Sequence, residues 1–347
     1  MYFPRLKIDL GKIFHNAKLI NDRCTVSGIS VVGVTKCICA DPRISGTIRD
    51  AGIRVFGDSR LNNLKKHSDN FGQEQELIML RGPMTTEIEE LINICGTSLN
   101  TQNETVKLIS EVCEKYDKTH KIIVMVETDD EREGLLPEDV GGFCRRVLKE
   151  CKNVEIAGLG TNARCINKKG PTRESSRILT DLKNDIERDL GINIGVLSGG
   201  NSSLWDLIEK GDLPAEINQV RIGEAILFGH ETAGFTPIQG TFQDSFKLEA
   251  SIIEVKKKNQ NMQRIIIALG LQDIKMRNMS CVLPGISVAD QSSDHTILEI
   301  NPGGKENGVG KDFLNLAVGG IISFNLNYFG LLSCMTSAYV KKVFTGT

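Results

Sequence analysis

The sequence has no long apolar run, no excess of charge of one sign and no CxxC pair, and each absence excludes a class of protein. No apolar stretch approaches the roughly 20 residues that a membrane-spanning helix needs. The formal net charge is only -2, without a long run of one sign, so neither a nucleic-acid partner nor an acidic membrane surface is indicated. The opening MYFPRLKIDL lacks the basic start and apolar stretch of a signal peptide, so we expect a cytoplasmic protein.

The ten cysteines do not follow a pattern typical of disulfides or of zinc. They are scattered through 347 residues without an export signal, so reduced thiols are expected. Cys37 and Cys39 are separated by one residue and the chain has only five histidines, so no metal site is expected. We interpret most cysteines as small buried apolar residues. Cys39 and Cys165 are set apart because they lie in segments that carry the chemistry discussed below.

Apolar runs alternate regularly with amphipathic stretches through the first two-thirds of the chain. The amphipathic stretches 85–95, 103–116 and 172–190 each begin with Thr or Asn and carry apolar residues at helical spacing. Such alternation predicts a (β/α)8 barrel of the TIM type, which we place at residues 11–235. The eight predicted strands are 29–36, 53–57, 76–81, 97–100, 120–127, 154–160, 193–198 and 217–222.

The pattern changes after about residue 235, where β-type segments are separated by Gly, Pro and Asn. These segments predict a second, all-β domain at residues 236–347. A short strand-like piece, PRLKIDL, precedes the first helix, and the residues alone do not identify its partner strand. The β-type segments are 246–258, 263–270, 295–302 and 319–328.

Glycine-rich turns follow the last two strands of the predicted barrel, at the strand ends where such barrels place their chemistry. The first turn, LSGGNSS, has paired glycines whose amides can approach a ligand, followed by an Asn and two Ser. The second, VRIGEA, adds Gly223, and barrels often bind phosphate between these two loops. The alternative is that Gly199, Gly200 and Gly223 only make tight turns.

The first predicted strand ends in Lys36, which is unusual for a strand that otherwise has a core sequence. A lysine surrounded by apolar and thiol side chains would have its ammonium form disfavoured, leaving an amine that can form an imine. A phosphate pocket across the barrel is what a pyridoxal phosphate aldehyde would need to reach that amine. The alternative is a lysine that extends to solvent and pairs with Asp41 or Asp58.

Several segments, in collinear order over most of the chain, resemble the alanine racemase group and most closely its alanine/ornithine racemase branch. They include GVTKCICADP, EREGL, GLGTNARC, SGGNSS, INQVRIGEAILFG, SSDHTILEI and MTSAYVKK. The resemblance implies a pyridoxal-phosphate barrel followed by a β-domain that also takes the first strand, residues 1–10. It further implies a homodimer with shared active sites and an amino-acid racemase, with ornithine or a similar amino acid as substrate.

The same resemblance implies roles for individual residues. Lys36 becomes the Schiff-base lysine and one of two acid/base groups. Arg221 faces the pyridine nitrogen, where a guanidinium only donates and so limits the ring as an electron sink. Arg132 lies near the phenolic oxygen, and Thr161 and Asn162 lie near the ring. Beside the Gly200 turn, the implied phosphate contacts come from Asn201, Ser202, Gly223, Glu224 and Tyr328.

One departure from the family concerns the second acid/base group, since racemisation with two bases needs proton donors on both faces of Cα. Alanine racemases supply a tyrosine from a longer loop, whereas residues 256–270 here form a short segment without tyrosine. The tyrosine that alanine racemases place four residues after the lysine is also absent, since position 40 is Ala. Ser293 and Asp294 correspond to β-domain residues that help close the partner's active site. The candidates for the second group are Cys39, Cys165, Asp294 and Tyr328.

Three hypotheses remain at this point. The first is a pyridoxal-phosphate-dependent racemase that acts through Lys36. The second is a pyridoxal-phosphate-binding or regulatory protein without turnover, which the shortened segment favours. The third is an enzyme with a different outcome, such as decarboxylation, because the same imine can serve several bond cleavages.

Overall fold

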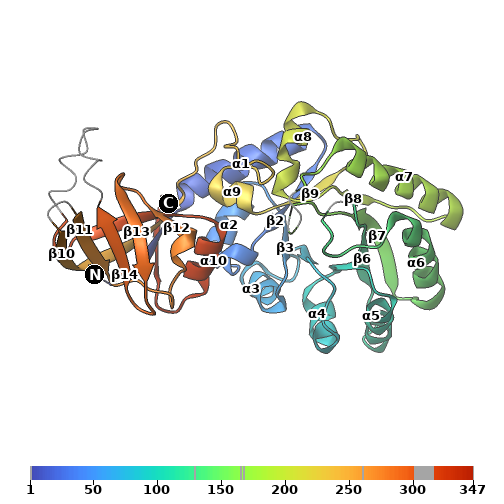
Figure 1. Ribbon diagram of the computed structural model, residues 1–347. Coiled ribbons are helices and arrows are strands. Elements are labelled where there is room, and N and C mark those ends of the chain that lie inside the picture. Colours follow the sequence, from blue (N-terminus) through green and yellow to red (C-terminus); the bar gives the residue numbers. More distant parts are fainter. Residues whose placement is uncertain are drawn as a thin grey trace. The chain divides into compact units, whose positions relative to one another are not determined.

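A computed structural model describes residues 2–128, 130–164, 166, 169–259, 262–300 and 316–346, and the chain divides into two compact units. The barrel unit comprises Ile13–Lys36 and Ala40–Gln243. The β unit comprises Met1–Lys12, Cys37–Cys39 and Asp244–Thr347. Figure 1 labels the helices and strands of both units.

Eight parallel strands close into a barrel in consecutive order, which confirms the predicted (β/α)8 fold. The ring closes where Val32 of the first strand pairs with Arg221 of the last. The strands are β2 (Ser30–Val34), β3 (Val55–Asp58), β4 (Leu77–Met79), β5 (Thr97–Asn100), β6 (His120–Met125), β7 (Val154–Gly160), β8 (Val196–Ser198) and β9 (Gln219–Ile222).

The helices that surround the barrel begin and end where local sequence signals place them. Asp41 caps α2, whose first residue is Pro42. Thr172 and Ser175 cap each other's backbone at the start of α7, and Gly191 ends that helix in the left-handed conformation. The helices are α1 (Leu10–Val26), α2 (Pro42–Asp50), α3 (Leu61–Phe71), α4 (Ile88–Ile94), α5 (Asn103–Lys115), α6 (Pro137–Glu150), α7 (Arg173–Leu190), α8 (Trp205–Lys210) and α9 (Glu224–Phe228).

The barrel buries side chains on both faces of its strands, as β6 illustrates. Ile122 and Val124 belong to the apolar layer shared with α4 to α7. Ile123 and Met125, which alternate with them, belong to a separate cluster with Val32, Ile78 and Leu99. Because side chains alternate along a strand, a run such as HKIIVM can fill both layers at once.

The barrel unit extends to Gln243, eight residues beyond the position at which the sequence pattern changes. The segment after α9 remains attached to barrel helices. The backbone N–H of Ile238 donates to Gly229 over 2.9 Å, and the Asn16 amide donates to the carbonyl oxygen of Phe242 over 2.8 Å. These contacts hold residues 236–243 on the barrel although they lack its strand–helix alternation.

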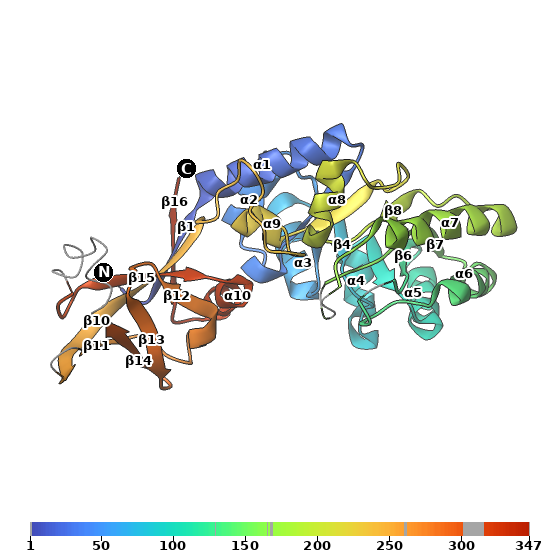
Figure 2. The ribbon, with the colours of Figure 1, turned by 45° about the horizontal axis from the view of Figure 1, so that its top comes forward.

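The β unit is built on one eight-stranded sheet with a short helix, α10 (Tyr328–Thr336). The first strand of the chain pairs antiparallel with β10 and parallel with β16, as the resemblance implied (Figure 2). The central path runs β12-β15-β10-β11-β14-β13. The strands are β1 (Arg5–Asp9), β10 (Phe246–Asn259), β11 (Met262–Ile267), β12 (Met279–Cys281), β13 (Ile286–Gln291), β14 (Thr296–Ile300), β15 (Ile321–Leu326) and β16 (Lys341–Thr345).

The short segment without tyrosine joins β10 to β11 as a hairpin in which Asn259 pairs with Met262. The two residues between them, 260 and 261, lie outside the described ranges. No helix within those ranges is long and apolar enough to cross a membrane.

Candidate active site

Lys36 lies two residues beyond the end of β2 and begins a short 3-10 helix, Lys36–Ile38. Its side chain is exposed, so the expectation that apolar and thiol groups desolvate the amine is wrong. The strand ends at Val34, and the turn carries Lys36 out beyond the layer of buried side chains. The alternative ion pairs are not formed either, since Asp41 caps α2 and Asp58 accepts hydrogen bonds from other groups.

A buried polar cluster lies directly before Lys36 in the chain. The Thr35 hydroxyl donates to Asp58 Oδ2 over 2.9 Å and lies 3.0 Å from His67 Nε2. Asn63 adds two further donations to the Asp58 carboxylate. Burial raises the pKa of Asp58, and its hydrogen bonds and the positive charge of Lys36 act in the opposite direction. The cluster therefore fixes the end of β2 to the end of β3.

His67 in this cluster is held neutral. Burial lowers the pKa of His67 to about 4, and its ring stacks on Phe56 with 4.7 Å between centroids. Because the Thr35 hydroxyl has one proton and donates it to Asp58, the neutral imidazole donates to Thr35 through Nε2–H.

Arg221 on β9 is buried and its guanidinium donates to several acceptors across the barrel mouth. Nη2 donates to the carbonyl oxygen of Thr161 over 2.5 Å and to Asn162 Oδ1 over 2.6 Å. Nη1 donates to the hydroxyl of Ser198. The side chain is only 4% exposed. A planar guanidinium with acceptors at both ends has a fixed orientation, which a lysine ammonium would lack.

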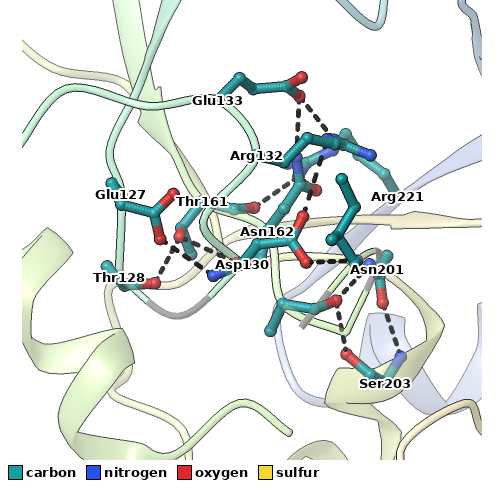
Figure 3. A network of polar contacts seen from close by, with 12 residues as sticks. Glu127, Thr128, Asp130, Arg132, Glu133, Thr161, Asn162, Asn201, Ser203 and Arg221 are labelled. Atoms are coloured by element: carbon teal, nitrogen blue, oxygen red, sulfur yellow. Dashed lines mark hydrogen bonds and ion pairs between the residues drawn. The ribbon is translucent and has the colours of Figure 1, made fainter. Parts of the chain in front are cut away.

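The loop after β6 brings Arg132 into the same network (Figure 3). Arg132 Nη2 donates to Glu133 Oε1 over 2.5 Å, and Arg132 Nε lies 3.7 Å from Asp130 Oδ2. The Glu133 oxygen also accepts from the Asn162 amide over 3.3 Å. Arg132 is thus connected to Asn162 through Glu133, and Asn162 contacts Arg221 directly.

The two glycine turns are joined to each other and to the loop after β7. The backbone N–H of Ala225 donates to the Ser202 hydroxyl over 3.2 Å. The Asn201 amide donates to the carbonyl oxygen of Ala163 over 2.8 Å (Figure 3). Gly200 has φ +140°, a backbone conformation that residues with a side chain rarely adopt. A Cβ atom on Gly223 would lie 2.9 Å from the carbonyl oxygen of Val34, which requires glycine for steric reasons.

Glu224 is partly buried at the start of α9, and its Oε1 lies 3.2 Å from His230 Nε2. The Thr161 hydroxyl forms a hydrogen bond with the hydroxyl of Thr128 in the loop after β6, with 2.6 Å between the two Oγ1 atoms. Both side chains therefore have partners within the barrel unit.

The remaining predicted residues belong to the β unit. Tyr328 is the first residue of α10, and Cys39 is half-buried with φ +53°. Ser293 and Asp294 lie on the turn between β13 and β14, where the Ser293 hydroxyl donates to Asp294 Oδ1. A hydrogen bond from His295 holds the pKa of Asp294 below its usual range. Cys165 lies outside the described residues.

Most of the other cysteines are buried in apolar surroundings, as interpreted from the sequence. Burial raises the pKa of Cys24, Cys95, Cys144 and Cys334 to about 12, which leaves them as thiols at neutral pH.

Comparison with known families identifies the barrel. The profile of the alanine racemase N-terminal domain matches residues 8–231. The chain belongs to the alanine racemase N-terminal domain family. Within this family it is similar along its full length to two characterised racemases. The lysine racemase of Thermotoga maritima is 34% identical over 99% of both chains. The ornithine racemase of Acetoanaerobium sticklandii is 30% identical over 98% of this chain and 99% of that one.

These relatives confirm the expected enzyme class, an isomerase that acts on amino acids. Solved structures show the same two-part alanine racemase fold at low sequence identity. Alanine racemase from Corynebacterium glutamicum superposes with a TM-score of 0.76 at 16% identity, covering 99% of this chain and all of that one. D-threo-3-hydroxyaspartate dehydratase from Delftia sp. HT23 superposes with 0.76 at 14% identity, covering 99% and 95%.

Sequence reasoning missed several polar residues that the structure brings into contact with the predicted site. Glu133 follows Arg132 in the quoted segment EREGL, but nothing in the spacing distinguishes it from a solvent-facing acid. Asp58 was considered only as a possible partner of Lys36, whereas Glu127 and Ser198 are the last residues of predicted strands. Their shared signal was a position at or after the carboxyl end of a barrel strand. The residues missed are Thr35, His67, Thr128, Asp130 and Glu133.

Proposed function

We propose that the chain is a pyridoxal-phosphate-dependent racemase of a basic amino acid such as ornithine or lysine. The observation that carries the proposal is the arrangement at two adjacent strands. Lys36 follows β2, and the buried Arg221 on β9 pairs through its backbone with Val32. An exposed amine and a fixed guanidinium on neighbouring strands suit a ring held between them.

The residues present fit that cofactor. The cofactor needs an anion site, a donor for its ring nitrogen and an amine for its aldehyde. The Gly223 cradle would be filled by a Cβ atom, and the Ala225 amide ties it to Ser202 on the other turn. We assign the phosphate to these turns, with Gly200, Asn201, Ser202, Gly223 and Glu224 around it. The role of Tyr328 as a phosphate contact stays a prediction from the resemblance.

The chain's own residues then divide the chemistry between them. When bound, the cofactor withdraws electrons from Cα of the attached amino acid and so acidifies the Cα–H bond. Arg221 donates a hydrogen bond to the ring nitrogen and keeps its own proton, because a guanidinium is not deprotonated in proteins. Arg132 donates to the phenolic oxygen, while Thr161 and Asn162 orient Arg221. Returning a proton to Cα is then favoured over moving electrons further into the ring.

Lys36 holds and returns the Cα proton on one face. We place the group for the other face among Cys39, Cys165, Asp294 and Tyr328. In this proposal Ser293 and Asp294 reach the site of a partner subunit in a homodimer. Their exposed turn between β13 and β14 supports this placement. The substrate is inferred from the two full-length relatives, which are named for lysine and for ornithine.

The first experiment tests covalent attachment. Purified protein incubated with pyridoxal phosphate should develop an absorption band, and borohydride reduction followed by peptide mapping should place the label on Lys36. Lys36→Ala should lose the band and turnover, whereas Lys121→Ala, an exposed lysine on β6, should keep both. Full turnover by Lys36→Ala would overturn the proposal.

The second experiment tests the reaction and its substrate. Ornithine, lysine, alanine and norleucine are incubated in heavy water, and Cα deuterium and configuration are measured. Exchange with inversion for ornithine and lysine, but not for norleucine, is expected. Label on Lys36 with no exchange would indicate a binding or regulatory protein. Release of carbon dioxide would indicate decarboxylation.

A further inference from the structure

The loop between β6 and α6 is held rigidly at its base. Val126 and Leu135 form an isolated β-bridge, and the backbone N–H of Glu127 donates to Leu135 over 2.8 Å. Gly134 has φ +150°, and a Cβ atom there would lie 2.5 Å from the Glu127 nitrogen. Arg132 and Glu133 are therefore carried by a closed loop whose base is fixed to the end of a barrel strand.

Asp130, inside this loop, is held by hydrogen bonds of its own. Asp130 is 1% exposed and accepts from the backbone N–H of Ile166 over 3.0 Å. Its own backbone N–H donates to Glu127 Oε1 over 2.9 Å (Figure 3). The loop thus presents Glu133 at a defined position rather than as a mobile surface acid.

One oxygen of Glu133 connects two side chains. Oε1 accepts from Arg132 over 2.5 Å and from the Asn162 amide nitrogen over 3.3 Å. The amide oxygen of Asn162 accepts from Arg221 over 2.6 Å. A carboxylate only accepts and a guanidinium only donates, so the two partners fix which way the Asn162 amide faces. Asn162 is 8% exposed, which makes an unpaired amide there costly.

We propose that Glu133 is a positioning residue that joins Arg132 to Arg221 through Asn162, so that both guanidinium groups are held as one unit. The functional benefit of this connection rests on the proposed function, in which Arg221 would bind the ring nitrogen of the cofactor and Arg132 its phenolic oxygen. An isolated, partly exposed ion pair between Arg132 and Glu133 would affect neither Asn162 nor Arg221.

The first test uses cofactor-free protein, so that it does not depend on the proposed function. Hydrogen exchange of peptides covering residues 158–163 and 219–223 is measured for Glu133→Ala, Glu133→Gln and the control Glu138→Ala. Glu138 is an exposed acid in the first turn of α6. Glu133→Ala should exchange about tenfold faster in both peptides. Glu133→Gln should show a smaller change, because its amide oxygen still accepts, and the control should match the parent protein.

The second test measures dissociation of pyridoxal phosphate in a double-mutant cycle of Glu133→Ala and Arg221→Lys. Each substitution should weaken binding by about tenfold, and the double variant should lose much less than the product. Faster exchange limited to residues 127–135, or effects on binding that multiply independently, would overturn the inference. If the parent protein failed to bind the cofactor, the proposed function would be overturned. The hydrogen-exchange result would still decide whether Glu133 positions the two arginines.

Discussion

Thr35 places its hydroxyl 2.9 Å from a carboxylate oxygen of Asp58, and its backbone continues directly into Lys36. Both side chains are fully buried. The position of Lys36 is therefore set by a polar contact between two strands as well as by the apolar packing of β2.

Thr35→Val keeps the volume of the side chain but removes one donor to a buried carboxylate and the acceptor of His67. We expect the free energy of unfolding to fall by about 1–3 kcal/mol, measured by urea denaturation of cofactor-free protein. Thr119→Val, at an exposed threonine, is the matched control. Equal stability of the two variants would contradict a structural role for the hydroxyl.

The stability of the protein should fall in weak acid because of two buried histidines. Burial lowers the pKa of His67 and of His120 from 6.5 to about 4. Between these values the unfolded chain takes up protons that the folded chain does not, so stability is present above pH 6.5 and is lost as the pH falls towards 4. Each histidine contributes at most on the order of 3 kcal/mol.

Urea denaturation at intervals from pH 4 to 7.5 measures this dependence. In His120→Gln the free energy of unfolding should depend less steeply on pH, because glutamine does not titrate and the contribution of His120 is removed. His15→Gln, at an exposed histidine, is the matched control. Identical slopes in all three proteins would show that His120 is not responsible.

Gly223→Ala should disturb the turn that we assign to the phosphate. The backbone there has φ -128°, which alanine tolerates, so the expected effect is steric contact with the carbonyl oxygen of Val34. We expect a loss of about 1–3 kcal/mol in stability and weaker binding of pyridoxal phosphate. Gly96→Ala, where a Cβ atom meets nothing within 4 Å, should change neither. Binding equal to that of the parent protein would place the phosphate elsewhere.

Asp294→Asn should affect the two antipodes of the substrate unequally. The hydrogen bond from His295 keeps the Asp294 carboxylate ionised at neutral pH, in the form that accepts a proton. We expect Cα deuterium exchange to slow by about 100-fold for one antipode and little for the other. Asp290→Asn, on the adjacent strand, is the control. The same asymmetry in Cys39→Ser, instead of Asp294→Asn, would identify Cys39 as the second group.

The barrel could be predicted from sequence because apolar strand segments such as SVVGV and HKIIVM alternate regularly with amphipathic helical segments. The strands β12, β13 and β16 were not predicted. Each is short or carries exposed polar residues, as in Ile286–Gln291, and exists through pairing with distant strands. Residues 236–243 likewise join the barrel through contacts that have no periodicity in the sequence.

Site residues that stand at the ends of strands or in recognisable motifs could be predicted. Contacts between residues that are distant in sequence could not. Arg132 and Asn162 follow β6 and β7, Arg221 lies on β9, and all three were implied by the resemblance. Their connection through Glu133 depends on how one loop folds back over β6, which the letters EREGL do not encode. The exposure of Lys36 depends on where β2 ends, and strand ends are the least certain part of a sequence-based assignment.

The pairing of β1 with β16 joins residues 5–9 to residues 341–345. The first strand to be synthesised therefore cannot complete its pairing until residues 341–345 have been synthesised. During translation the barrel strands can assemble while β1 still has an open edge. Contacts between such distant segments form slowly, because a very long loop must close before they are gained. We expect nascent chains that end before residue 341 to be captured by chaperones through this edge, even when their barrel has already formed.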